Sequence, residues 1–134
     1  MQLFNLFIHR FTSNHFVGGL GFKLRYEATK EPPQMTYRIS ACGGNFTTPN
    51  GILTSPSYPE NYPDSSSCFY TISRPTNTYL NLHILIFDLH YTYHCDDYLE
   101  IRDGISEDSP LIGKFCGNTF PQSIQTTQSK VWTK

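Results

Sequence analysis

The sequence predicts an all-β protein, an antiparallel β-sandwich stapled by disulfides. Aromatic residues make up 15% of the chain and charged residues only 16%, a balance that suits a pleated, partly buried sheet. Short segments alternate apolar and polar residues, and glycine and proline turn signals separate them. No segment carries a convincing helical stripe, so we expect strands throughout. The 134 residues allow one compact domain and a fragment of another.

The chain divides into three segments. Residues 1–26 predict two strands around a loop that contains Gly18-Gly19. Residues 27–41 predict a linker, because Pro32-Pro33 blocks both a helix and a central strand. Residues 42–134 hold every cysteine and predict a run of short strands divided by turns. We therefore place a domain boundary near residue 41.

Alternation also predicts which strands are best defined. The strongest is Tyr79–Leu89, and two clear strands follow, Tyr98–Arg102 and Leu111–Phe115. Within the first of these we expect one apolar face and one polar face. The apolar face would consist of Leu80, Leu82, Ile84 and Ile86, and the polar face of Asn81 and His83. In the N-terminal segment, the same rule places Phe22, Leu24 and Tyr26 on one face.

The cysteines indicate an oxidising, extracellular environment. There are four, Cys42, Cys68, Cys95 and Cys116, and none forms a CxxC pair of the kind found in zinc ribbons. Four cysteines allow three pairings, of which we favour Cys42–Cys68 and Cys95–Cys116 because they join neighbouring elements. Asn45-Phe46-Thr47 is a glycosylation sequon and agrees with a secreted context.

Several function classes are not expected. The net charge of −1 gives no electrostatic reason to bind nucleic acid or an anionic membrane. No apolar run approaches the roughly 20 residues that a membrane-spanning helix needs. Met1–Phe11 has its charge after the apolar stretch, so we expect a truncated chain rather than a signal peptide. His90 and His94 are four residues apart but precede Cys95 in a strand–loop region, so they predict no zinc protease and no enzyme.

The ordered motifs of residues 42–117 resemble the CUB domain family. They are Cys42-Gly43-Gly44, Ser55-Pro56-x-Tyr58-Pro59-x-x-Tyr62-Pro63, Cys68-x-Tyr70-x-Ile72, Leu82-x-Ile84-x-x-Phe87-Asp88-Leu89, Cys95-x-Asp97-Tyr98-Leu99-Glu100-Ile101-x-Asp103-Gly104 and Phe115-Cys116-Gly117. The resemblance implies a CUB (jelly-roll-like) β-sandwich in an extracellular or cell-surface protein.

The first segment resembles the end of a CUB domain. Such domains close with x-F-x-S-D and then G-F-x-x-x-Y, matched here by Phe11-Thr12-Ser13-Asn14 and Gly21–Tyr26. Residues 1–26 are thus expected to be the last strands of a preceding CUB domain, and residues 42–134 a CUB domain whose own last strands are missing. We hypothesise that the first strands complete the second sandwich, with Phe22 and Tyr26 contacting residues 79–115.

The resemblance also implies a calcium site. Many CUB domains bind calcium through a tyrosine, a glutamate and two aspartates, and the calcium orients acidic side chains toward a basic residue of a partner. Tyr62 matches the tyrosine and Asp97 one aspartate, but His90 stands where the glutamate is expected. The second aspartate would lie beyond Lys134. Because imidazole is a poor calcium ligand, we expect at most a partial site, and no other cofactor is predicted.

The expected function is an extracellular, non-catalytic, protein-binding module. The resemblance is greatest to part of an endocytic receptor built from repeated CUB domains. The alternatives are an accessory module of a tolloid-like or complement-like secreted protease and a carbohydrate-binding CUB protein. We predict Tyr91, Tyr93 and His90 as partner-binding residues, because tyrosine suits interfaces and these residues precede Cys95 in a loop. Tyr58 and Tyr98 are expected to pack internally.

Overall fold

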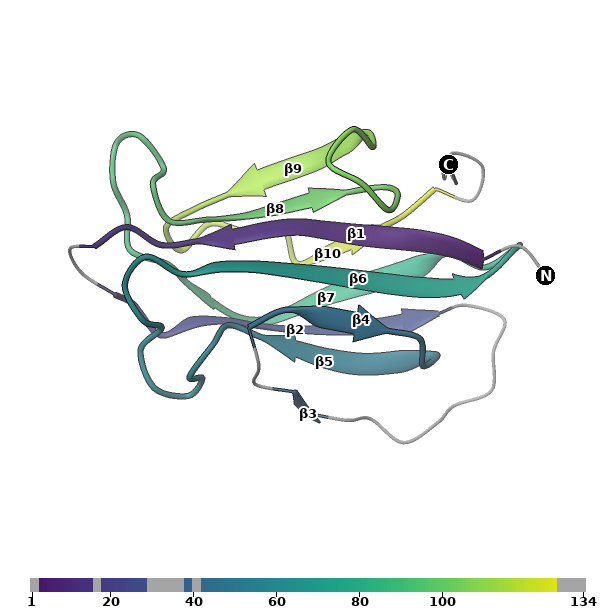
Figure 1. Ribbon diagram of the computed structural model, residues 1–134, viewed down its shortest axis with the longest axis horizontal. Coiled ribbons are helices and arrows are strands. Elements are labelled where there is room, and N and C mark those ends of the chain that lie inside the picture. The colour runs from purple at the N-terminus through teal and green to yellow at the C-terminus, as the bar shows by residue number, and fades with distance from the viewer. Residues whose placement is uncertain (1–2, 16–17, 29–37, 40–41, 128–134) are drawn as a thin grey trace.

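The described residues of the protein form ten β-strands in two sheets, seen in a computed structural model (Figure 1). The structure describes residues 3–15, 18–28, 38–39 and 42–127, and these contain no helix. The strands are β1 (Leu3–Thr12), β2 (Gly21–Ala28), β3 (Arg38–Ile39), β4 (Gly44–Phe46), β5 (Asn50–Thr54), β6 (Ser67–Pro75), β7 (Leu80–Asp88), β8 (Tyr98–Arg102), β9 (Leu111–Phe115) and β10 (Ser123–Gln125).

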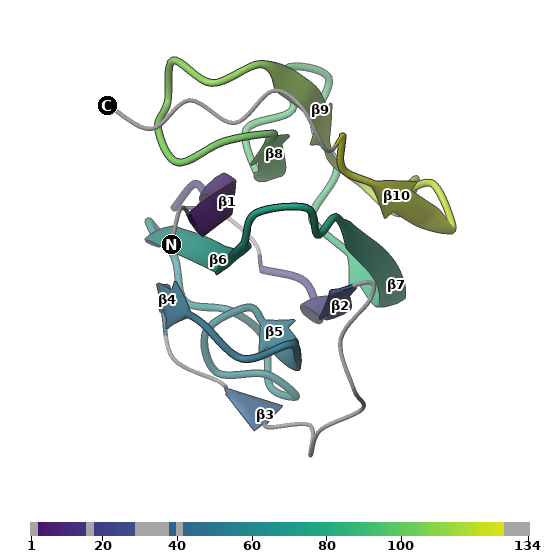
Figure 2. The same cartoon turned by 90° about the vertical axis from the view of Figure 1, so that its right-hand side faces the viewer.

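The strands form two five-stranded sheets that face each other (Figure 2). The first sheet has the order β4-β6-β1-β8-β9, and the second has the order β10-β7-β2-β5-β3. All neighbours are antiparallel except β3 with β5 and β4 with β6, which are parallel. The predicted fold class, an all-β antiparallel sandwich, is confirmed.

The two strands from the start of the chain occupy the middle of the sheets. β1 pairs with β6 on one side and with β8 on the other. β2 likewise pairs with β5 and β7, so that Phe22 lies opposite Phe87 and Tyr26 opposite Leu82. The hypothesis that these strands complete the sandwich of the second segment is therefore confirmed. That they are the last strands of a preceding domain stays a prediction.

The core lies between the sheets and takes side chains from both ends of the chain. Phe11, Phe22, Leu24 and Tyr26 are fully buried. They pack with a larger buried set from the rest of the chain: Phe46, Leu53, Tyr62, Cys68, Tyr70, Ile72, Leu80, Leu82, Leu89, Leu99 and Ile101. The rings of Phe11 and Phe22 meet edge-on at 5.3 Å between centroids, so the first two strands bring the two sheets into contact.

One predicted face is wrong, and a β-bulge is the reason. Leu80 and Leu82 point into the core and Ile84 is half-buried, but Ile86 is 37% exposed. Lys23 of β2 lies opposite Ile86 and the next residue, Leu24, opposite Ile84, so β7 carries an extra residue there. An extra residue reverses the alternation of everything that follows. Phe87, not Ile86, consequently packs against the core.

Other boundaries differ by small amounts. Tyr98–Arg102 and Leu111–Phe115 are strands with the predicted bounds. The predicted linker begins later, because β2 runs to Ala28, and it contains β3, which extends the second sheet beyond β5. Most of the predicted linker and the end of the second segment, residues 29–37, 40–41 and 128–134, lie outside the described residues.

Both predicted disulfides are present. Cys42–Cys68 ties the start of the second segment to β6, and Cys95–Cys116 closes the ends of the β8–β9 hairpin. No cysteine is free. Both bridges join residues within 42–127, and neither reaches β1 or β2. Residues 42–127 therefore form a disulfide-bonded body, and β1 and β2 pack into it without a disulfide of their own.

Candidate functional site

Four loops meet at one end of the sandwich, at the left in Figure 1. They are the β1–β2 loop, the β5–β6 loop, the β7–β8 loop and the segment after β9. Hydrogen bonds join them: the backbone N–H of Tyr62 donates to the carbonyl of Gly19, and that of Leu89 donates to the carbonyl of Gly117. We call this region the loop end. Every site residue predicted from the sequence except Asn45, Cys42 and Cys68 lies on these loops.

Asp97 is the buried centre of the loop end. Its side chain is fully buried, and its two oxygens accept different donors. The Tyr62 hydroxyl donates to Oδ2 at 2.7 Å, and the Asn14 backbone N–H donates to Oδ1 at 2.6 Å. The backbone N–H of His90 donates in turn to the Tyr62 hydroxyl at 2.8 Å. Hydrogen bonds to a charged acceptor are the stronger kind, so this network fixes three loops on one carboxylate.

The Tyr62 hydroxyl keeps its proton. Burial raises the pKa of Tyr62 well above its ordinary value of 10. The backbone donor from His90 opposes that rise, whereas the hydrogen bond to Asp97 and the charge of that carboxylate add to it. A protonated phenol is what the network requires, because Tyr62 must donate to Asp97 while accepting from His90.

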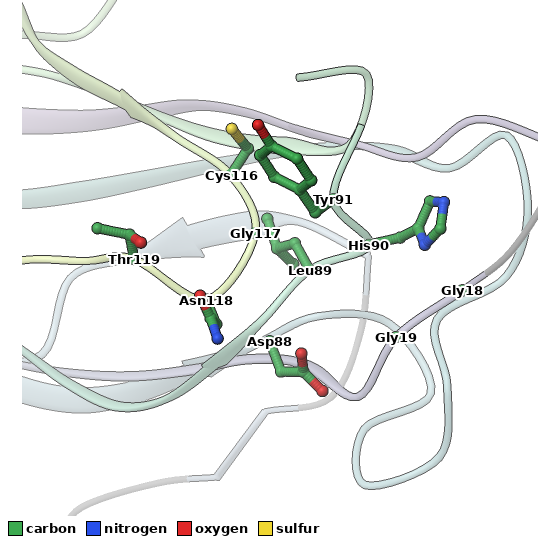
Figure 3. A pocket seen from close by; sticks show the side chains of 10 residues that line it. All are labelled: Gly18, Gly19, Asp88, Leu89, His90, Tyr91, Cys116, Gly117, Asn118 and Thr119. Atoms are coloured by element: carbon green, nitrogen blue, oxygen red, sulfur yellow. The ribbon is translucent and has the colours of Figure 1, made fainter. Parts of the chain in front are cut away.

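These residues do not fit a calcium ion. Calcium takes six to eight oxygen ligands, several of them carboxylates. Among the described residues there is no group of three His, Cys, Asp or Glu side chains that could hold a metal. Asp97 is the carboxylate at the centre of this network, and both of its oxygens already accept hydrogen bonds. At the position expected for a glutamate, His90 contributes its backbone N–H, and its imidazole points away from Leu89 and Asn118 (Figure 3). The partial calcium site at Tyr62 and Asp97 that the resemblance implies therefore stays a prediction, and the arrangement of these residues does not support it.

A cavity of about 520 Å³ lies beside this network. Its lining comes from the β1–β2 loop, the end of β7, the β7–β8 loop and the segment after β9: Gly18, Gly19, Asp88, Leu89, His90, Tyr91, Cys116, Gly117, Asn118 and Thr119. Figure 3 shows the Tyr91 ring beside Cys116 and Gly117. Asp88 is the acidic residue among the described lining residues, which include no lysine or arginine. The loop end therefore offers a concave, weakly acidic surface with an aromatic edge.

Two tyrosines project from the β7–β8 loop. Tyr91 is 68% exposed and Tyr93 is 89% exposed. The backbone N–H of Cys95 donates to the carbonyl of Thr92, and that of Asp96 donates to the Thr92 hydroxyl. The Cys95–Cys116 disulfide closes the loop beyond them. The two rings are thus presented to solvent by a loop that is fixed on both sides.

Comparison with known proteins supports the resemblance. The CUB domain family profile matches residues 42–134, more than half of the chain. The chain belongs to the CUB domain family. Human cubilin is 38% identical over 120 residues, which cover 85% of this chain and 3% of cubilin. Human neuropilin-2 is 38% identical over 125 residues, or 88% of this chain and 13% of that protein.

Further relatives agree. Mouse tolloid-like protein 2 is 37% identical over 117 residues, which cover 87% of this chain and 10% of the relative. The chain therefore spans a small part of the relatives it matches, and no solved structure matches it. The predicted resemblance to the CUB domain family is confirmed, and cubilin from human, rat and pig matches at 36–38% identity.

The remaining predicted residues, Asn45, Tyr58 and Tyr98, lie at least partly at the surface of this CUB domain. Asn45 is exposed on β4, where its side-chain oxygen accepts a hydrogen bond from Thr71, and its glycosylation stays a prediction. Tyr58 and Tyr98 are half-buried rather than packed inside. A lysine ammonium covers each ring, Lys23 at 5.9 Å and Lys114 at 3.9 Å from the centroid. The aliphatic stem of a lysine can cover a ring at the surface, which a pattern of tyrosines does not predict.

Sequence reasoning missed Asn14 as a site residue. Because the first strands complete the sandwich, the β1–β2 loop carries Asn14 to Asp97 from the opposite end of the chain. A signal was present, since Ser13-Asn14 stands in the x-F-x-S-D position that marks the end of a CUB domain. The contribution is a backbone N–H, which no residue type encodes. Asn118 and Thr119 of the cavity were also missed, and no motif marks them.

Proposed function

We propose that this chain is an extracellular protein-binding CUB module that recognises its partner with the loop end. One observation carries the proposal: Tyr91 and Tyr93 are strongly exposed on a loop held by hydrogen bonds and a disulfide. Tyrosine supplies a large contact area at low entropy cost and is enriched among residues that dominate binding energy. A loop that is already ordered loses little further freedom on binding. His90 supports the same surface through its backbone.

The proposed location is the extracellular space or the cell surface. CUB domains and disulfide bonds occur in extracellular proteins, and both are present here. The described residues include no helix long and apolar enough to cross a membrane. Glycosylation at Asn45 fits the same location. It would appear as a loss of mass after treatment with an N-glycosidase when the chain is produced in a secreting cell, and as no change in an Asn45→Gln variant.

We further infer that the parent protein is a receptor of the cubilin type that takes up its ligand, and that this module is not catalytic. Cubilin from three species is among the relatives. These three matches cover 85–92% of the chain, whereas residues 42–134 make up only about two thirds of it, so the similarity continues before Cys42. Such continuity supports a repeat of CUB domains. The full-length sequence tests this inference: further CUB domains without a protease domain support it, and a protease domain refutes it.

The binding proposal is tested on the folded chain. The probes are a panel of purified secreted and cell-surface proteins and a panel of neutral and acidic glycans, measured by biolayer interferometry. We expect a protein ligand whose affinity falls at least about 10-fold in Tyr93→Ala and in Tyr91→Ala. Leu111→Ala is the matched control, because Leu111 is a similarly exposed apolar residue on β9, and we expect its affinity to stay unchanged.

Two outcomes would contradict the proposal. One is a protein ligand whose affinity is the same in both tyrosine variants, which would move the binding surface away from the loop end. The other is binding to a glycan with no protein ligand, which would favour the carbohydrate-binding alternative.

A further inference from the structure

The sandwich is built from two pieces that have no disulfide between them. We call residues 3–28 the strand pair and residues 42–127 the acceptor body. Both disulfides lie inside the acceptor body. The strand pair joins it through residues 29–41 of the chain and otherwise through non-covalent contacts.

The acceptor body depends on the strand pair for its two sheets. β1 is the middle strand of the order β4-β6-β1-β8-β9, and β2 is the middle strand of β10-β7-β2-β5-β3. Among the described strands, removal of β1 and β2 would leave four separate two-stranded ribbons. These are β4–β6, β8–β9, β10–β7 and β5–β3. An isolated two-stranded ribbon is at best marginally stable in water. Removal would also take four fully buried side chains from the core: Phe11, Phe22, Leu24 and Tyr26.

The contacts between the pieces are specific as well as extensive. Asn14 donates its backbone N–H to Asp97, and the Ser13 hydroxyl donates to the carbonyl of Pro63 at 2.8 Å. The backbone N–H of Phe22 donates to the Ser55 hydroxyl at 3.1 Å. Gly21 has φ +89°, and a Cβ there would collide with the Ser55 side chain. The acceptor body therefore selects a strand that begins with glycine after a loop that carries a serine at the position of Ser13.

We propose that the acceptor body takes the strand pair of a second copy of this chain, so that two copies assemble by reciprocal strand exchange. A second copy supplies the selected sequence, and every contact named above can form between copies as it does within one. Opening breaks no covalent bond, because neither disulfide links the pieces. The covalent link between the two pieces favours the closed monomer, because a short link corresponds to an effective concentration of about 1 mM. The closed monomer dominates at micromolar concentration, and exchange becomes comparable near millimolar concentration.

A cross-strand cysteine test reports the exchange directly. Arg25 on β2 and Ile52 on β5 lie opposite each other, so cysteines at these two positions can join when the strands pair. Two variants of the 134-residue chain are prepared, one with Arg25→Cys and one with Ile52→Cys. They are mixed, opened in urea with the native disulfides intact, refolded at about 10 µM or about 1 mM, diluted and oxidised. We expect the fraction of disulfide-linked heterodimer to rise at least about 10-fold at the higher concentration.

Two controls keep the test decisive. Arg25→Cys mixed with Leu111→Cys, which lies in the other sheet, is expected to give no such rise. The double variant Arg25→Cys/Ile52→Cys, oxidised as a dilute monomer, ties the strand pair to its own acceptor body. It is expected to reduce the dimer measured by light scattering at about 1 mM at least about 10-fold relative to the unmodified chain. The proposal would be overturned if the unmodified chain stays monomeric at about 1 mM. It would also be overturned if the tied variant dimerises as much as the unmodified chain.

Discussion

Replacing Tyr62 with phenylalanine removes one oxygen atom from the buried network at the loop end. The Asp97 carboxylate loses the donor at 2.7 Å from Oδ2, and the His90 N–H loses its acceptor at 2.8 Å. The ring itself stays, so its edge-on contact with Phe11 at 4.9 Å between centroids is kept and no cavity opens. The change therefore tests the hydrogen bonds alone.

The magnitude follows from these two bonds. A hydrogen bond to a charged acceptor contributes about 1.5–3 kcal/mol, and a neutral one about 0.5–1.5 kcal/mol. Asp97 has no exposed surface through which water could replace the lost donor. We expect Tyr62→Phe to lower the free energy of unfolding by about 2–4 kcal/mol. Equilibrium unfolding in urea without reductant should show this as a midpoint lowered by about 1–2 M.

Tyr58→Phe is the matched control for this prediction. Tyr58 is half-buried under the Lys23 ammonium, and within the described ranges its hydroxyl makes no hydrogen bond. Its loss should change the free energy of unfolding by less than about 0.5 kcal/mol. In an Asp97→Asn background the cost of Tyr62→Phe should shrink, since the buried charge is gone. An equal effect of the two Tyr→Phe changes would refute the assignment of Asp97 as the centre of the loop end.

Three further predictions concern metal, redox state and pH. Calorimetric titration should show no sub-millimolar calcium affinity, because the described residues contain no group of three His, Cys, Asp or Glu side chains that could hold a metal; tight binding abolished by Asp97→Ala would contradict this expectation. Reducing Cys42–Cys68 should cost roughly 2–5 kcal/mol of unfolding free energy, and an unchanged melting temperature in strong reductant would argue against a stabilising bridge. Burial raises the pKa of Tyr62 and Tyr70 above the ordinary value of 10, so the folded state holds these protons more tightly than the unfolded state. The contribution of these two tyrosines to the free energy of unfolding should therefore be constant below pH 10 and fall as the pH rises above 10. Tyrosinate absorbance from the two residues should appear only when the protein unfolds. Its appearance in the folded protein would contradict the burial argument.

The parts of the fold that could be predicted from the sequence are those that local pattern determines. β8 and β9 have the predicted bounds because each is a short alternating run between turns. The disulfides were predictable because only four cysteines exist and neighbouring ones close nearby elements. The bulge in β7 was not predictable, because it depends on how β2 pairs with β7 and not on the residues of β7 alone. One extra residue then exposes Ile86 and turns Phe87 inward.

The candidate site could be predicted from the sequence only where a side chain, rather than the backbone, makes the contact. Tyr62 and Asp97 were found by resemblance, and the structure joins them with a direct hydrogen bond. The partners that complete the network, Asn14 and His90, act through backbone N–H groups, which leave no mark in a sequence. The histidine at position 90 predicted the loss of a metal ligand. It did not predict that the backbone N–H of His90 would donate a hydrogen bond to the Tyr62 hydroxyl.

The network also explains why the loop end and the completeness of the sandwich depend on each other. Asp97 belongs to the acceptor body, and Asn14 belongs to the strand pair. A carboxylate with no exposed surface is costly unless donors surround it, and one of its two donors arrives only when the strand pair is in place. Loss of the strand pair would leave Asp97 short of a donor and release the loop that carries Tyr62 and His90. The position at which the family resemblance implies calcium therefore acts here as a joint between the two pieces, and changes at Asp97 should weaken retention of the strand pair as well as the loop end.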